Sequence, residues 1–201
     1  QDALDCLIEM YIAYFNRAPD AVGLAFWSTA YANGLSLEEI ADGFADQPET
    51  RALYSEDSLS ITFVSDVYQN VLGRAPDMDG LWFWADALDA GAVSRGRFIF
   101  EMLRGAKADT PADASPGFVA QQQADRQYLE QKADLGALFA VHRGMSDNDI
   151  AVHVLSLFDG SADSFETAVE AIETAHVAAM DPVTGDFLMQ LVGVLDDPFQ
   201  L

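Results

Sequence analysis

Apolar side chains recur three or four positions apart along most of the chain. This spacing places them on one face of an α-helix, and it first predicts an amphipathic helix over residues 2–16. The apolar residues of that face are Leu4, Leu7, Ile8, Tyr11, Ile12 and Phe15. No segment shows the strict alternation of apolar and polar residues that is typical of a half-buried strand. The pattern therefore predicts an all-α protein.

Helix start and stop signals divide the first half into short helices. Pro19 ends the first helix, and Asp20 is placed to cap the second, which stops at Gly34. Ser36 followed by Glu39 predicts a capping box. The helices expected up to residue 104 span residues 2–16, 20–33, 36–46, 48–54, 58–72, 77–91 and 94–104.

A motif of the form Arg-x-Pro-Asp-x-x-Gly-Leu-x-x-Trp occurs twice, once from Arg17 and again from Arg74. The copies also agree upstream, at Tyr11 and Tyr68. A duplicated motif indicates two supersecondary units, each of which buries its apolar face against its neighbour. We therefore expect tandem helical units that share one interior.

The residues of the motif suit a tight corner between two helices. Proline stops one helix, aspartate caps the next, and glycine three residues later allows a ring or backbone to approach closely. The arginine is expected to bond the free carbonyls of the first helix or to pair with a carboxylate. The residues given this structural role are Arg17, Asp20, Gly23, Arg74, Asp77 and Gly80.

The second half of the chain is helical but is not a third copy. Residues 105–117 contain Pro111 and Pro116 and predict a linker or surface loop. Further helices are expected at residues 118–142, 147–158 and 164–180, with a last one after Asp181 that carries Phe187, Leu188, Leu191 and Val194. We expect a first helical repeat over 1–56, a second over 57–108, a linker over 109–117 and a C-terminal helical region over 118–201 that packs against the repeats.

Charge narrows the class of partner. The chain carries 33 acidic and 10 basic residues, a formal net charge of −23. Such a surface repels nucleic acids and anionic membranes, so neither is expected as a partner. No apolar run approaches the ~20 residues that a membrane span needs, so no membrane insertion is expected. The single cysteine, Cys6, excludes an intramolecular disulfide.

Aromatic residues near the two corners are the candidate binding surface. Trp82 has Ala25 as its counterpart in the first copy, so the fold does not demand a ring there. An exposed ring at such a site can stack on a sugar or anchor a protein partner. The candidate binding residues are Phe26, Trp27, Tyr31, Trp82, Phe83 and Trp84.

Two other chemistries stay open. Asp77 and Asp79 offer two carboxylates at one corner, a candidate site for calcium, whereas the first copy lacks the second acid. A pair of carboxylates acting as a hydrolase is the alternative for an enzyme. No cofactor is expected. The chain contains no glycine-rich phosphate loop, no nucleophile elbow and no zinc-protease motif, and its three histidines are too scattered to predict a zinc site.

The segment Tyr68-Gln69-Asn70-Val71-Leu72-Gly73-Arg74-Ala75-Pro76-Asp77, with Gly80-Leu81, Phe83-Trp84, Gly91 and Ser94-Arg95 after it, resembles the bacterial domain-of-unknown-function family numbered 4214. The first copy matches more loosely, with Asn16 in place of Gly73. The resemblance implies a part of a larger secreted or cell-surface protein, since members often accompany calcium-binding glycine-rich repeats. The family has no agreed activity or catalytic residues.

Together these observations predict a non-enzymatic interaction or adhesion module of a secreted or cell-surface bacterial protein. It is expected to bind a protein or glycan partner through its aromatic corners. The alternatives are an extracellular hydrolase with paired carboxylates and a calcium-stabilised scaffold.

Overall fold

The computed structural model describes residues 3–185, and every regular element in that range is a helix. The helices are α1 (Ala3–Phe15), α2 (Ala21–Ala32), α3 (Leu37–Ala45), α4 (Pro48–Leu53), α5 (Ser60–Leu72), α6 (Met78–Asp89), α7 (Arg95–Lys107), α8 (Pro116–Ala137), the π-helix η1 (Leu138–His142), α9 (Asn148–Ser156) and α10 (Ala162–Ala179). The predicted all-α class is confirmed, and none of the described helices is long and apolar enough to cross a membrane.

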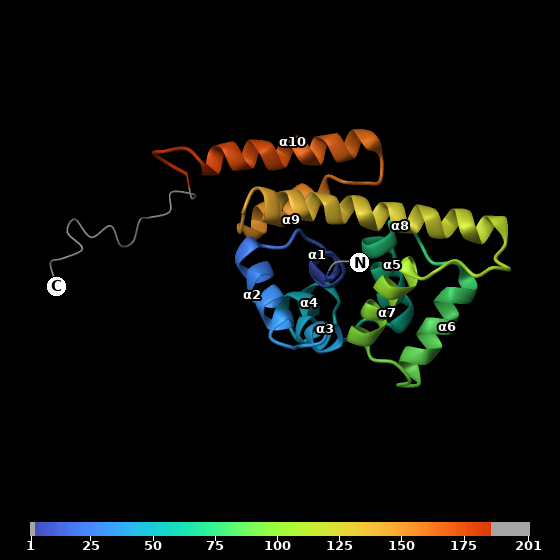
Figure 1. The fold of residues 1–201 in the computed structure, drawn as a ribbon. Coiled ribbons are helices and arrows are strands. Elements are labelled where there is room, and N and C mark those ends of the chain that lie inside the picture. Colours follow the sequence, from blue (N-terminus) through green and yellow to red (C-terminus); the bar gives the residue numbers. More distant parts are fainter. Residues whose placement is uncertain (1–2, 186–201) are drawn as a thin grey trace.

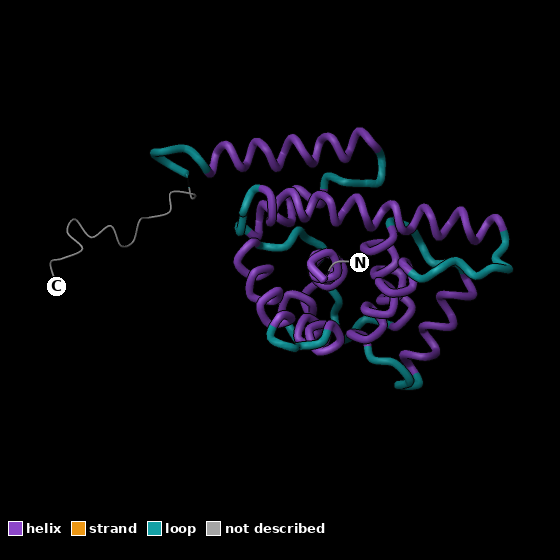
Figure 2. The backbone as a smooth tube through the Cα atoms, in the orientation of Figure 1, coloured by secondary structure: helices purple, strands orange, loops and turns teal. Residues whose placement is uncertain are grey.

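The helices form two groups under a common cover (Figure 1). Helices α1–α4 make one group and α5–α7 the other. Helix α8 runs across both, α9 lies beside α8 next to the first corner, and α10 lies on the outer side of α8. Short loops join the helices of each group, and a longer loop over residues 108–115 leads into α8 (Figure 2). The C-terminal helices therefore pack against the tandem repeat, as the sequence predicts.

Helix α1 is the centre of the core. From Leu7 to Phe15 every residue is buried, including Glu9. The predicted helix is present, but the structure buries more than the one apolar face that the sequence pattern indicates, because α2, α3, α4, α5, α7 and α8 all pack around α1. A helix covered on all sides can be apolar all round, and this one is buried by elements that come later in the chain.

The predicted helix starts are confirmed at the caps. Asp20 and Asp77 accept hydrogen bonds from the backbone N–H groups of Gly23 and Gly80 at 2.6 and 2.7 Å. Ser36 and Glu39 form the reciprocal capping box. Caps depend on residues three apart in the sequence, so local sequence is enough to place them.

Several predicted boundaries change. The loop before α8 covers residues 108–115, shorter than the predicted linker at 105–117, because α7 continues to Lys107 and Pro116 occupies the first turn of α8. The helix predicted over residues 118–142 ends in the wider π turn of η1. The helix predicted after Asp181 lies largely outside the described residues, and Asp181 itself accepts hydrogen bonds from Val183 and Thr184 in a turn.

The two repeats share one interior, as the duplicated motif predicts. The Tyr14 hydroxyl of α1 donates to the Gly96 carbonyl of α7 at 2.7 Å. Phe63 of α5 and Phe98 of α7 lie in a single hydrophobic cluster with the buried residues of α1 and α3. Because each repeat fills part of the other's core, neither has a complete apolar interior by itself.

Candidate functional site

The two corners have matching geometry around their glycines. A Cβ atom built on Gly23 would lie 2.3 Å from the Tyr11 hydroxyl, and one built on Gly80 would lie 3.3 Å from the Tyr68 hydroxyl. A ring from the preceding helix therefore packs directly over each glycine. This confirms the predicted role of the glycine, with less room in the first copy than in the second.

The corner arginines bind carboxylates through two hydrogen bonds. Arg17 donates to Glu49 at 2.6 and 3.1 Å, and Arg74 donates to both oxygens of Asp125 at 2.7 Å. The Arg17 guanidinium also lies over the Tyr11 ring, 5.2 Å from its centroid, and the Arg74 guanidinium lies over the Tyr68 ring in the same way. Two-point ion pairs fix orientation as well as charge, so each corner is tied to one particular neighbouring helix.

That neighbouring helix differs between the copies. Glu49 belongs to α4, within the first repeat, whereas Asp125 belongs to α8, beyond the loop that follows the second repeat. Both helices carry proline in the first turn. Helix α8 therefore supplies to the second repeat the carboxylate that α4 supplies to the first.

Lys132 of α8 likewise contributes to the second repeat a contact that the first copy makes within its own repeat. Its side chain is 3 % exposed, and its ammonium donates to the Asn70 carbonyl of α5 at 2.7 Å and to the Asn16 side chain at 3.1 Å. The position equivalent to Asn70 in the first copy is Ala13, whose carbonyl accepts from the Tyr54 hydroxyl at 2.8 Å. Burial lowers the pKa of Lys132 to about 7.

Lys132 did not stand out as a site residue in the sequence. The only available signal was a lysine one turn after Tyr128, on the apolar side of a predicted helix. Its ammonium lies 5.6 Å from the Tyr128 ring centroid. A buried lysine with two oxygen acceptors and a nearby ring is a structural anchor between α8 and both repeats.

The predicted aromatic residues separate into two classes. Trp27 and Trp84 are half-buried, and each packs on a core phenylalanine, Phe44 at 5.1 Å and Phe98 at 5.0 Å. The others are exposed: Phe26 by 63 %, Phe83 by 65 %, Trp82 by 51 % and Tyr31 by 40 %. The structure therefore assigns the two tryptophans of the motif to packing and leaves the four other rings available on the surface.

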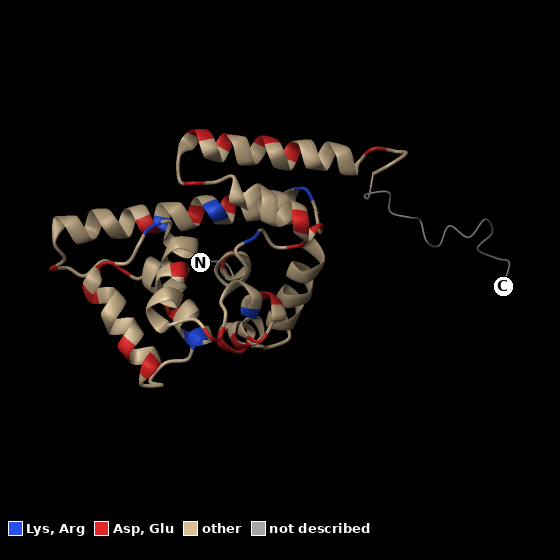
Figure 3. Cartoon of the chain, turned by 180° about the vertical axis from the view of Figure 1, so that it is seen from behind, with Lys and Arg blue, Asp and Glu red and all other residues tan. Residues whose placement is uncertain are grey.

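The exposed rings of the two corners do not meet. Phe26 lies against Trp27 and Phe83 against Trp84, both with ring centroids 5.1 Å apart in an edge-to-face arrangement. Helices α2 and α6 occupy opposite flanks of the molecule in Figures 1 and 3. The six predicted residues thus form two separate aromatic faces, one on α2 and one on α6.

Charge around the α6 face is acidic. Helix α6 contains Asp79, Asp86 and Asp89 and no basic residue, and α10 likewise carries acids without Lys or Arg. Figure 3 shows red acidic positions without blue ones on both helices. The α2 face contains no charged residue between Ala21 and Ala32.

Asp77 and Asp79, the predicted calcium ligands, have different roles in the structure. Asp77 caps α6 through the Gly80 N–H, and Asp79 is an exposed residue of its first turn. Among the described residues, no group of three or more His, Cys, Asp and Glu side chains is placed to hold a metal ion. The calcium hypothesis therefore stays a prediction from the sequence.

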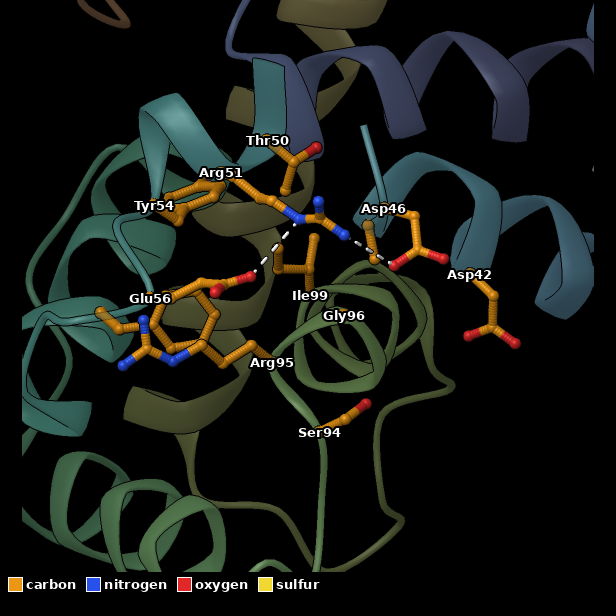
Figure 4. Close-up of a pocket in the computed structure, with 12 residues that line it drawn as sticks. Asp42, Asp46, Thr50, Arg51, Tyr54, Glu56, Ser94, Arg95, Gly96 and Ile99 are labelled. Carbon is orange, nitrogen blue, oxygen red and sulfur yellow. Dashed lines mark hydrogen bonds and ion pairs between the residues drawn. The ribbon is translucent and has the colours of Figure 1, made fainter. Parts of the chain in front are cut away.

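A polar cavity of about 470 Å³ opens where the two repeats meet. Figure 4 shows Arg51 reaching between Asp46 and Glu56, 3.3 Å from a carboxylate oxygen of each. Arg95, on the far wall, donates to the Ser55 and Ser58 carbonyls and lies over the Phe63 ring at 4.7 Å. Both arginines of this cavity already bind groups of the chain, and its acidic residues are exposed to solvent. We therefore interpret the cavity as a solvent-filled gap between the two repeats.

A second polar cavity, of about 390 Å³, lies between α1 and α8. Burial, together with the charges of Glu130 and Asp5, raises the pKa of Asp134. Lys107 pairs with Glu9 in the same cavity, and burial lowers the pKa of that lysine. Asp134 itself is exposed on α8, and a raised pKa alone does not define a catalytic acid, so the hydrolase hypothesis also stays a prediction.

The fold and the corners define a class, an all-α protein built from a duplicated helix-corner unit under a helical cover. A family model described as "Domain of unknown function (DUF4214)" matches residues 7–54 and again 47–109. The chain belongs to this family, as the motif resemblance predicts. No curated protein and no solved structure matches it significantly.

Proposed function

We propose that this chain is a non-enzymatic interaction module of a secreted or cell-surface bacterial protein, and that it docks partner proteins through the aromatic faces of α2 and α6. The observation that carries the proposal is the matched exposure of Phe26 and Phe83. They occupy the same position in the two copies and are 63 % and 65 % exposed. The duplication retains a large exposed ring that neither copy buries.

The composition of the faces favours a protein partner. On α6, Met78 and Trp82 extend the exposed surface around Phe83, and on α2 Val22 does so around Phe26. Clustered exposed aliphatic and aromatic side chains match the buried centre of a protein interface. The carboxylates of α6 complement a partner whose apolar patch is bordered by Lys and Arg.

The position of the faces favours a bridging role. Because α2 and α6 lie on opposite flanks, one chain can contact two partners at once, or two copies of one partner (Figure 1). Two weak contacts on one rigid body act together, since the first raises the effective concentration of the second. Such bivalence suits assembly or attachment at a cell surface.

The test compares proteins retained from a surface extract of the source bacterium by the immobilised chain and by variants. The triple variant Phe26→Ser, Trp82→Ser and Phe83→Ser is expected to lose a specific partner. Val177→Ser, at a 70 % exposed position on α10, is the matched control and is expected to retain it. Retention of the same proteins by the wild type and the triple variant contradicts the proposal.

The retained partner is then purified and titrated against the single variants. Phe26→Ser and Phe83→Ser are each expected to weaken binding, because each removes one anchor ring of a separate face. If only one of them does, the chain binds through a single face and the bridging role is wrong.

A further inference from the structure

A cavity of about 260 Å³ lies between the second repeat and α8, next to the pair formed by Arg74 and Asp125. We propose that this cavity binds a single sugar ring. The proposal is independent of the protein-binding faces, because its walls come from α5, α7, α8 and the half-buried side of α6. The exposed rings Phe83 and Phe26 are not among them.

The cavity exists because the second copy lacks two rings that the first copy has. In the first copy Phe15 of α1 stacks on Phe44 of α3 with centroids 4.9 Å apart. In the second copy Leu72 takes the position of Phe15, counted from the corner arginine, and Met102 takes the position of Phe44, counted from the serine cap. Both line the cavity, so it opens where the first copy is filled with aromatic rings.

The Phe44 ring of the first copy also contacts Tyr11 at 5.0 Å and Trp27 at 5.1 Å. The counterparts of these two rings, Tyr68 and Trp84, are kept in the second copy and line the cavity. The same corner therefore folds with its centre filled in one copy and hollow in the other. The fold of the corner does not require the hollow, so the hollow is a candidate ligand site.

One wall of the cavity carries a connected set of polar groups. Asp125 accepts from Arg74 through two bonds, and the Gln121 amide donates to the same carboxylate at 2.8 Å. Arg74 and Asp125 neutralise each other, and Glu101 and Asp77 add negative charge at the edge. A free anion is therefore disfavoured, whereas hydroxyl groups can donate and accept without leaving a charge unpaired.

The remaining walls are largely apolar and aromatic. Tyr68, Trp84 and Phe118 contribute rings, and Met102 and Ala106 contribute aliphatic surface. Aromatic rings beside a few planar polar side chains suit a ligand with apolar faces and a polar rim. A sugar ring has this chemistry, since its C–H faces are apolar and its hydroxyls lie around the edge. The volume is small for a ligand pocket and fits one ring rather than a chain.

The experiment uses the indole N–H signals of the three tryptophans in a ¹⁵N-labelled chain. Methyl glycosides of glucose, galactose, mannose and N-acetylglucosamine are titrated in turn. Trp84 lines the cavity, whereas Trp27 belongs to the first repeat and Trp82 to the exposed face, so these two serve as internal controls. We expect at least one glycoside to shift the Trp84 signal alone, with an affinity on the order of 1 mM.

Variants then test the location. Leu72→Phe with Met102→Phe restores the rings of the first copy and is expected to abolish the shift. Phe118→Ala and Gln121→Ala change exposed residues of α8, and each is expected to weaken binding about three- to tenfold. Gln123→Ala, an exposed residue of α8 outside the cavity, is the matched control and should bind as the wild type does.

Three outcomes overturn the proposal: no Trp84 shift with any of the four glycosides, an equal shift in the folded Leu72→Phe, Met102→Phe variant, or equal weakening in Gln123→Ala. Should the double variant fail to fold, Phe118→Ala and Gln121→Ala decide the question by themselves. The triple variant of the aromatic faces retains Trp84 and should keep the sugar-induced shift, which separates this site from the proposed function.

Discussion

Arg74 and Asp125 are 51 residues apart and form a two-bond ion pair that ties the second repeat to α8. The side chain of Asp125 is 10 % exposed and that of Arg74 is 26 % exposed. Removing one partner of such a pair leaves a poorly solvated charge, which costs more than losing a surface contact.

Asp125→Asn is expected to lower the free energy of unfolding by about 1–3 kcal/mol, because Arg74 loses its charged acceptor. Arg51→Gln, in the exposed pair with Glu56, is the control and should change it by less than about 1 kcal/mol. Urea unfolding measures both. Equal effects of the two substitutions would show that the α8 pair is merely a surface contact.

A chain that ends at residue 109, where the family match stops, is expected to lose cooperative unfolding. Helix α8 covers α1 closely enough that a Cβ atom on Gly136 would lie 2.9 Å from the Ile8 side chain. Without α8, apolar residues of α1 face water, and each costs about 1.5–3 kcal/mol. Circular dichroism melting checks this, with a chain ending at residue 159 as the control that keeps α8 and α9 and is expected to melt cooperatively.

Stability is expected to rise as the pH increases from about 7 toward 10. Burial lowers the folded-state pKa of Lys132 to about 7, while the unfolded lysine titrates near 10.5. Between these values the unfolded state binds more protons, so the free energy of unfolding increases with pH, by at most about 1.4 kcal/mol per pH unit.

Lys132→Met is expected to flatten that rise in urea titrations at pH 7, 8 and 9. An unchanged slope in this variant would assign the pH dependence to other groups. Above pH 10 stability should fall again, because burial raises the pKa of Tyr14 and Tyr54 in the folded state while the unfolded tyrosines ionise.

Gly23→Ala is expected to destabilise the protein more than Gly80→Ala. The added methyl would lie 2.3 Å from the Tyr11 hydroxyl in the first copy, but 3.3 Å from the Tyr68 hydroxyl in the second. Overpacking of this kind costs about 1–3 kcal/mol. Thermal melting of both variants checks the order, and Tyr11→Phe combined with Gly23→Ala should recover part of the loss by removing the clashing oxygen.

Some features of the fold follow from sequence because they are local. The caps at Asp20, Asp77 and Ser36 involve groups three residues apart, and each corner glycine contacts a tyrosine of the helix directly before it in the chain. The sequence also predicts that each corner arginine bonds free carbonyls of the first helix or pairs with a carboxylate. It cannot name the carboxylate, because Glu49 and Asp125 are reached through different lengths of chain.

The sequence was enough to predict which aromatic residues gather at the corners, but not which of their rings are exposed on the surface. The repeat pointed to Phe26, Trp27, Phe83 and Trp84 together, while the structure buries part of each tryptophan and exposes each phenylalanine. Neighbouring residues of a helix point about 100° apart, so small rotations of α2 and α6 decide which ring faces the core. That rotation depends on the helices packed beneath them.

The sequence by itself determined that this protein is all-α, duplicated and capped at two equivalent corners, because these properties depend on spacing and on contacts within a few residues. Only the tertiary structure decided that α1 is buried on every side, that α8 completes the second repeat through Asp125 and Lys132, and that a hollow lies where the first copy packs two phenylalanines. These properties depend on how distant helices dock, and docking follows the shape of the whole core rather than any local pattern.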